Sequence, residues 1–121
     1  MSTVLVVEDS VTESEIIIRY LQQAGLTVLS ARSVEEAQAT LFRQKPDLIV
    51  LDVILPGQSG FELCRELKID PKTSPIPVVM CSTKDTEVDK MWGKMLGADA
   101  YLPKPLNQQE LLQTVQRLMR G

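Results

Sequence analysis

The stretch "DLIVLDVILPG", residues 47–57, places one acidic side chain inside an otherwise apolar run. A short apolar run that Pro-Gly closes is typical of a strand buried on both faces, where a lone carboxylate is costly. Either Asp52 lies at the end of the strand, facing solvent and a cation, or the segment is not a strand.

Strand-like and helix-like segments alternate along the rest of the chain. Four further segments are short, apolar and rich in β-branched residues: "TVLVV" (3–7), "LTVLSA" (26–31), "IPVVMC" (76–81) and "AYL" (100–102). Between the five strands, apolar residues recur with helical periodicity. Five βα units with continuous apolar strands predict an α/β fold, in which helices cover both faces of a five-stranded parallel sheet.

Several helix ends are marked by local signals. A Gly at residue 25 or 97 is suited to the position just after a helix. A hydroxyl or amide residue followed three positions later by Glu is the spacing of a capping box or its Asn analogue, and it predicts helix starts at Ser10, Ser33, Ser59 and Asn107.

Length and composition indicate an ordinary globular chain. It has 121 residues, 44% of them hydrophobic and 24% charged, with a net charge of −3. We expect one domain over residues 1–121, cytoplasmic, with no membrane segment, because no apolar stretch approaches the roughly 20 residues of a membrane span. The absence of a basic cluster argues against nucleic-acid binding.

The sequence contains no histidine, which excludes Ser-His-Asp triads, Cys-His pairs and imidazole metal sites within this chain. Any histidine phosphochemistry must therefore come from a partner. The two cysteines, Cys64 and Cys81, do not form a CxxC motif, and we expect both to be buried thiols.

Acidic residues follow two of the predicted strands. Glu8 and Asp9 follow the first strand, and Asp52 follows the core of the third. If the strand order is 2-1-3-4-5, these strands are neighbours and the three carboxylates converge. Two like charges about 4 Å apart repel by roughly 4 kcal/mol at an effective dielectric constant near 20, so a cation or a bound proton is required. Oxygen ligands without His or Cys indicate Mg²⁺. The alternative is that Glu8 and Asp9 form a solvated helix cap and Asp52 only ends a strand.

Two later residues complete a phosphoryl-binding pattern. Ser82 closes the fourth strand and Lys104 the fifth, and a hydroxyl and an ammonium group are suited to bind phosphoryl oxygens beside a metal. Taken singly, Ser82 is also an ordinary loop residue and Lys104 an ordinary solvated charge. Their joint occurrence at the ends of neighbouring strands favours the functional interpretation.

The segments "VVEDS", "DLIVLDVILPGQSGFEL", "IPVVMCST" and "GADAYLPKPL" resemble the CheY-like receiver domains of bacterial two-component response regulators. The resemblance extends over all 121 residues. It implies a flavodoxin-like, doubly wound (βα)5 fold with the order 2-1-3-4-5, Mg²⁺ as cofactor and a sensor histidine kinase as partner. No output domain is expected.

The resemblance also implies roles at the acidic residues. Asp52 is the expected phosphoacceptor. Asp9 and Asp52 are expected to bind Mg²⁺ directly, Glu8 through water, and Ile54 through its backbone carbonyl.

Further roles are implied near the last two strands. Ser82 is the expected switch hydroxyl, Lys104 pairs with the phosphoryl group, and Tyr101 is the aromatic residue that changes rotamer on activation. A cis peptide is expected between Lys104 and Pro105. The expected output face comprises the fourth helix, fifth strand and fifth helix, with Trp92 and Tyr101 as possible contributors.

Three residues depart from the commonest family pattern. Ile54 is apolar where some relatives carry a polar group, and Lys84 is basic where several are acidic or amide; both bear on the lifetime of the phosphoryl group. Pro103 removes an amide donor just before Lys104, which bears on the geometry of the fifth strand.

A narrower likeness links "VEDSVTE" and "STKDTEVDKMWGKMLGADAYLPKP" to the PilH-type stand-alone regulators of type IV pilus twitching motility. It implies the histidine kinase of a chemotaxis-like system as phosphoryl donor and a downstream protein that is not identified. We expect no enzymatic activity beyond self-phosphorylation and self-dephosphorylation.

Other functions share the predicted topology. A flavodoxin-type FMN module wants a hydroxyl- and glycine-rich loop after the first strand, where this chain has acids. A haloacid-dehalogenase-type phosphatase normally has a second Asp where Ile54 stands. A docking module that works without phosphorylation and a phosphate sink stay open as alternatives.

Overall fold

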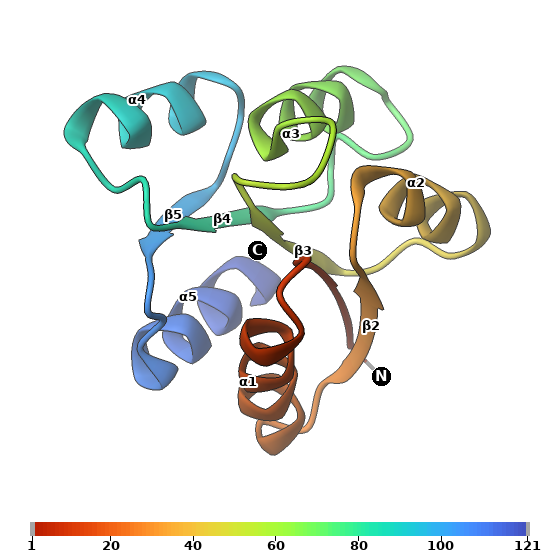
Figure 1. Ribbon diagram of the computed structural model, residues 1–121. Coiled ribbons are helices and arrows are strands. Elements are labelled where there is room, and N and C mark those ends of the chain that lie inside the picture. Colours follow the sequence, from red (N-terminus) through yellow and green to blue (C-terminus); the bar gives the residue numbers. More distant parts are fainter. Residues whose placement is uncertain (1, 121) are drawn as a thin grey trace.

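The computed structural model describes residues 2–120, which form five strands and five helices in strict alternation (Figure 1). In chain order, these elements are β1 (Thr3–Val7), α1 (Val11–Gln23), β2 (Thr27–Ala31), α2 (Val34–Arg43), β3 (Leu48–Asp52), α3 (Gly60–Ile69), β4 (Val78–Ser82), α4 (Glu87–Met95), β5 (Ala100–Pro103) and α5 (Gln108–Arg120).

The strands form one parallel sheet with the order β2-β1-β3-β4-β5, which confirms the predicted topology. Helices α1 and α5 cover one face of the sheet, and α2, α3 and α4 lie on the other (Figure 1). Strands β1, β3 and β4 are buried along their whole length. Because helices cover both of their faces, these three strands are apolar without alternation.

The sheet separates two hydrophobic core layers. Beneath α1 and α5, Val6 and Val50 of the sheet pack with Ile17, Leu21 and Leu111. The opposite layer joins the other sheet face to α2 and α3; its members include Leu5, Leu51, Ala37, Leu63 and Met80. Both cysteines are free and buried, as expected.

Helix starts follow the local signals in most cases. The hydroxyls of Ser10 and Ser33 accept the amides three residues later, and the Asn107 side chain accepts the amide of Glu110. The Ser59 hydroxyl instead accepts the amide of Phe61, one residue earlier than predicted. The structure thus confirms all four predicted starts.

The start of α4 was not predicted. Thr86 caps this helix, and Thr86 and Asp89 form a complete capping box. The box has Asp in the position where the usual pattern has Glu or Gln, and so it does not match the S/T-x-x-E/Q signature. At the helix ends, Gly25 and Gly97 have φ angles of 83° and 102°, as predicted for glycines that follow a helix.

Lys68 joins the end of α3 to the two strands beyond it. Its ammonium donates to the carbonyls of Ser74 and Ile76 at 3.2 and 2.8 Å and to the carboxylate of Asp99 at 3.1 Å. The same Asp99 carboxylate accepts the amide of Val78 at 2.8 Å. This cluster therefore fixes the amino ends of β4 and β5.

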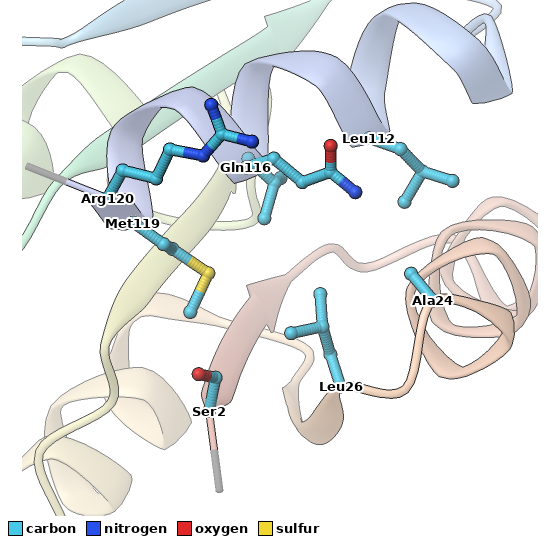
Figure 2. Close-up of a pocket in the computed structure, with 8 residues that line it drawn as sticks. Ser2, Ala24, Leu26, Leu112, Gln116, Met119 and Arg120 are labelled. Carbon is cyan, nitrogen blue, oxygen red and sulfur yellow. The ribbon is translucent and has the colours of Figure 1, made fainter.

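An apolar pocket of about 240 Å³ lies at the amino ends of β1 and β2 (Figure 2). Leu26, Leu112 and Met119 contribute to its lining, beside Ser2 and the Arg120 side chain. The pocket is at the opposite end of the sheet from the acidic residues. Within residues 2–120, no helix has the length and apolar character needed to cross a membrane.

Candidate functional site

The carboxyl ends of β1 and β3 bring Glu8 and Asp52 together. Val7 pairs with Leu51 across the two strands, and Glu8 and Asp52 are the next residues of each chain segment. Glu8 is 1% exposed and Asp52 is 4% exposed. The expectation that Asp52 ends its strand is therefore confirmed, but its carboxylate is buried and does not face solvent.

The cation that faces Asp52 is Lys104, whose side chain is 6% exposed. The Lys104 ammonium contacts the carboxylates of Asp52 and Glu13 at 3.0 Å each, and it forms a short hydrogen bond with Glu8. The second Asp52 oxygen accepts the amide of Ile54 at 3.2 Å. One ammonium group thus donates hydrogen bonds to three carboxylates.

Burial and hydrogen bonding shift two pKa values in this cluster. Burial raises the pKa of Glu8 to about 7, against the hydrogen bonds from Lys104 and the Ser10 amide, which lower it. Burial alone would lower the pKa of Lys104, but its bonds to Glu8, Glu13 and Asp52 raise that pKa above its ordinary value. Lys104 therefore remains an ammonium group throughout the neutral range.

Glu13 is a site residue that the sequence reasoning missed. The sequence predicts Glu13 only as the third residue of a capping box that begins at Ser10. Its side chain reaches Lys104 from the first turn of α1, which follows the end of β1 after a short loop (Figure 1). Its position five residues after Glu8, one turn into the helix that follows the acidic pair, was the available signal.

Asp9 is not in this carboxylate cluster. Its side chain is exposed, and its backbone carbonyl accepts a hydrogen bond from Arg32 at 3.4 Å. Successive side chains along an extended segment point to opposite sides, so that the Glu8 side chain is buried while the Asp9 side chain is exposed. Among the described residues, Glu8, Glu13 and Asp52 form the one group of three carboxylates whose oxygens all lie within 4.8 Å of one another.

The chemistry of this donor set fits Mg²⁺. The three clustered carboxylates supply only oxygen ligands, and the sequence has no histidine that would favour a softer metal. Glu8 and Asp52, both expected near the metal, are together in the pocket. Direct binding by Asp9 and by the carbonyl of Ile54 stays a prediction.

Ser82, at the end of β4, and Tyr101, on β5, both contact Lys84 in the loop after β4. The buried Ser82 hydroxyl accepts the amide of Lys84 at 3.0 Å, and the Tyr101 hydroxyl donates to the Lys84 carbonyl. Burial raises the pKa of Tyr101, while a hydrogen bond with Ser82 lowers it. Both expected switch residues therefore form hydrogen bonds with the backbone of the same residue, Lys84.

Pro103 does not shorten β5. It pairs with Ser82 in the sheet, and the amide of Lys104 then donates to the Ser82 carbonyl at 3.0 Å. The Lys104-Pro105 peptide bond is cis, as the resemblance implies.

Trp92 is 50% exposed on α4, beside a cavity of about 320 Å³ between α3 and α4. Phe61 also lines this cavity and stacks on the ring of Tyr101, with the ring centroids 6.4 Å apart. Both aromatic residues assigned to the output face thus lie around the α3–α4–β5 region. Their role in output stays a prediction.

Gly60 allows α3 to begin directly against the phosphoacceptor candidate. A Cβ atom at this position would lie 2.0 Å from the backbone oxygen of Asp52. The amide of Gly60 also donates to the carbonyl of Val53 at 2.8 Å. Only glycine permits this approach, which places the first turn of α3 beside the end of β3.

Two curated relatives match almost the whole chain. Protein PilH of Pseudomonas aeruginosa strain PAO1 is 40% identical over 121 residues, which is all of both chains. The phosphate regulon transcriptional regulatory protein PhoB of the same strain is 41% identical over 118 residues; the match covers 98% of this chain and 52% of PhoB. The chain therefore spans about half the length of that second relative.

A solved structure shares the fold closely. The chemotaxis response regulator CheY4 of Vibrio cholerae superimposes with a TM-score of 0.90 at 34% sequence identity, over 98% of each chain. Residues 4–116 match the response regulator receiver domain family. With its flavodoxin-like topology and its acidic pocket at the strand ends, this chain belongs to the response regulator receiver domain family.

Proposed function

We propose that this chain is a phosphorylation-dependent response regulator whose Asp52 accepts a phosphoryl group from a histidine kinase. The observation that carries the proposal is the 3.0 Å contact between the Asp52 carboxylate and the Lys104 ammonium, in a buried pocket at the strand ends. Membership of the receiver domain family supports a histidine kinase as the partner.

In the proposed reaction, one carboxylate oxygen of Asp52 attacks the phosphorus of a phosphohistidine on the kinase. A P–O bond forms to Asp52, the P–N bond breaks, and its electron pair stays with the imidazole nitrogen. Lys104 neutralises charge on the phosphoryl oxygens, and the Ile54 amide holds the second Asp52 oxygen. Mg²⁺ held by Glu8, Asp52 and the predicted ligands Asp9 and Ile54 would supply further positive charge to those oxygens.

The signal is proposed to pass through Ser82 and Tyr101. A phosphoryl oxygen on Asp52 would accept a hydrogen bond from the Ser82 hydroxyl and draw that hydroxyl away from the Lys84 amide, which now donates to it. Withdrawal of Ser82 would free the space into which Tyr101 turns, and the surface of α4, β5 and α5 would change.

The proposed biological setting is the control of type IV pilus motility, with a chemotaxis-like kinase and a downstream protein. The support is the 40% identity to PilH along the full length of both chains. We propose no catalytic activity on other substrates. Neither a flavin module nor a phosphatase is supported by the family to which the chain belongs.

The test is phosphorylation by acetyl phosphate with Mg²⁺, followed by intact-mass measurement and peptide mapping. We expect one phosphoryl group on Asp52 and none on Asp52→Asn. Asp85→Asn, which removes an exposed carboxylate in the loop after β4, is the matched control and should be labelled like wild type. Equal labelling of Asp52→Asn would refute the assignment.

A binding experiment separates signalling from docking. Affinity capture of partners with and without beryllofluoride, a phosphoryl mimic, should recover the downstream protein only in the presence of the mimic. Equal recovery in both conditions, and by Asp52→Asn, would instead favour a docking module that works without phosphorylation.

A further inference from the structure

Glu13 brings a third carboxylate into the pocket from a helix, whereas Glu8 and Asp52 come from strand ends. One Glu13 oxygen is 3.0 Å from the Lys104 ammonium. Oxygens of all three carboxylates lie within 4.8 Å of one another. The Glu13 side chain is 43% exposed, so it reaches the pocket from the solvent side while Glu8 and Asp52 lie inside.

The position of Glu13 follows from an incomplete capping box at the start of α1. In a complete box, the third residue of the helix returns its carboxylate to the amide of the cap residue. Here the Ser10 amide donates instead to Glu8 at 3.2 Å, while the Ser10 hydroxyl accepts the Glu13 amide at 3.3 Å. The Glu13 carboxylate is thereby available to Lys104.

This arrangement has opposite consequences for the two ligands of the pocket. A divalent cation gains attraction from each nearby carboxylate. A phosphoryl group is repelled by the same charges, and it must also take the Lys104 ammonium away from Glu13. Glu13 is the most exposed of the three acids and the one that is free to move into solvent.

We propose that Glu13 is a positioning residue that acts through Lys104 and competes with the phosphoryl group for it. In the unphosphorylated protein, Glu13 holds Lys104 and strengthens Mg²⁺ binding. On phosphorylation it is displaced from Lys104, so it opposes the phosphorylated state. This inference rests on the proposed function, since it concerns the same pocket.

The test compares Glu13→Gln with wild type in two titrations. Mg²⁺ affinity is measured by calorimetry without a phosphoryl donor, and beryllofluoride affinity is measured at saturating Mg²⁺. We expect Glu13→Gln to weaken Mg²⁺ binding by about tenfold, the effect of one nearby charge partly screened by water. It should strengthen beryllofluoride binding, because Lys104 loses a competing partner.

The controls separate this role from a structural one. Glu15→Gln removes an exposed carboxylate on the same helix and should change neither affinity. Glu13→Asp keeps the charge and should restore much of the Mg²⁺ affinity. Glu13→Ala serves as a second neutral variant, and melting curves check that each variant folds.

The outcomes are distinct. If Glu13→Gln and Glu13→Ala lower both affinities together, or change neither, while wild type is phosphorylated on Asp52, the inference is wrong and the proposed function stands. If wild type binds no beryllofluoride and accepts no phosphoryl group, the proposed function fails, and the inference fails with it.

Discussion

Gly60, the first residue of α3, lies against the backbone carbonyl of Asp52, and a Cβ atom there would approach that oxygen to 2.0 Å. The added Cβ atom would clash with a backbone atom, so rotation of a side chain could not relieve the clash. The absence of a side chain at Gly60 therefore permits the start of α3 to lie this close to the end of β3.

Gly60→Ala is expected to destabilise the fold severely, by about 3 kcal/mol or more, because the helix or the strand end must shift. Urea unfolding followed by circular dichroism measures the loss. Gly57→Asn is the control: this neighbouring glycine has open space around it and a φ of 81°, which Asn tolerates. A loss for Gly60→Ala no greater than that for the control would contradict the contact.

Lys104→Met should leave three carboxylates without their common cation. We expect a loss of about 3 to 5 kcal/mol of unfolding free energy in metal-free buffer, as for a buried ion pair that loses one partner. Because Mg²⁺ would neutralise the same charges, its addition should recover part of the loss. Lys90→Met, at an exposed pair with Glu87 at 3.8 Å, should change stability little. Equal effects of the two variants would show that the carboxylates do not need Lys104.

Glu8 predicts a specific pH dependence in metal-free buffer. Its pKa rises from an ordinary value of 4.5 to about 7 on folding, so the folded state holds a proton that the unfolded state has lost. The contribution of Glu8 to stability therefore falls as the pH rises through that window. Glu8→Gln has no such proton, and its stability relative to wild type should rise on the order of 2 kcal/mol between about pH 5 and pH 8. Urea unfolding at each pH gives the difference; a constant difference would show that the Glu8 pKa is not raised.

Lys68→Met tests the cluster that fixes the amino ends of β4 and β5. It removes the donor to the carbonyls of Ser74 and Ile76, and we expect a loss of about 1 to 3 kcal/mol. Lys72→Met, at an exposed position in the following loop, is the control and should be close to neutral. The melting temperatures of the two variants measure the difference. Equal melting temperatures would show that hydrogen bonds from water replace those from Lys68 without loss of stability.

Most of the sheet was predictable because the central strands are continuous apolar runs. For β1 the predicted and observed ranges coincide, and β3 ends at Asp52, which is one of the two possibilities stated for that residue. The prediction for β4 began two residues early, since Ile76 and Pro77 extend the apolar run although Pro77 has no amide to donate to the sheet. An apolar pattern in the sequence indicates which residues are buried, whereas the first and last residues of a strand are set by its hydrogen bonds and are therefore harder to predict.

The candidate site was predictable in its strand-end residues but not in its helical one. Glu8, Asp52, Ser82 and Lys104 each follow or close a strand, and the carboxyl ends of parallel strands meet at one edge. Glu13 was missed because its side chain leaves the usual capping pattern. The burial of Asp52 was also missed, since it depends on Lys104, which is 52 residues away in the sequence.

The first turn of α3 touches both ends of the proposed signalling path through two consecutive residues. Gly60 abuts the backbone of Asp52, and Phe61 stacks on the ring of Tyr101. Consecutive residues of α3 thus contact the backbone of the proposed phosphoacceptor and the ring of Tyr101, separately from the proposed route through Ser82. Because neither contact involves Ser82, a variant without the Ser82 hydroxyl would keep the packing of α3 against both Asp52 and Tyr101.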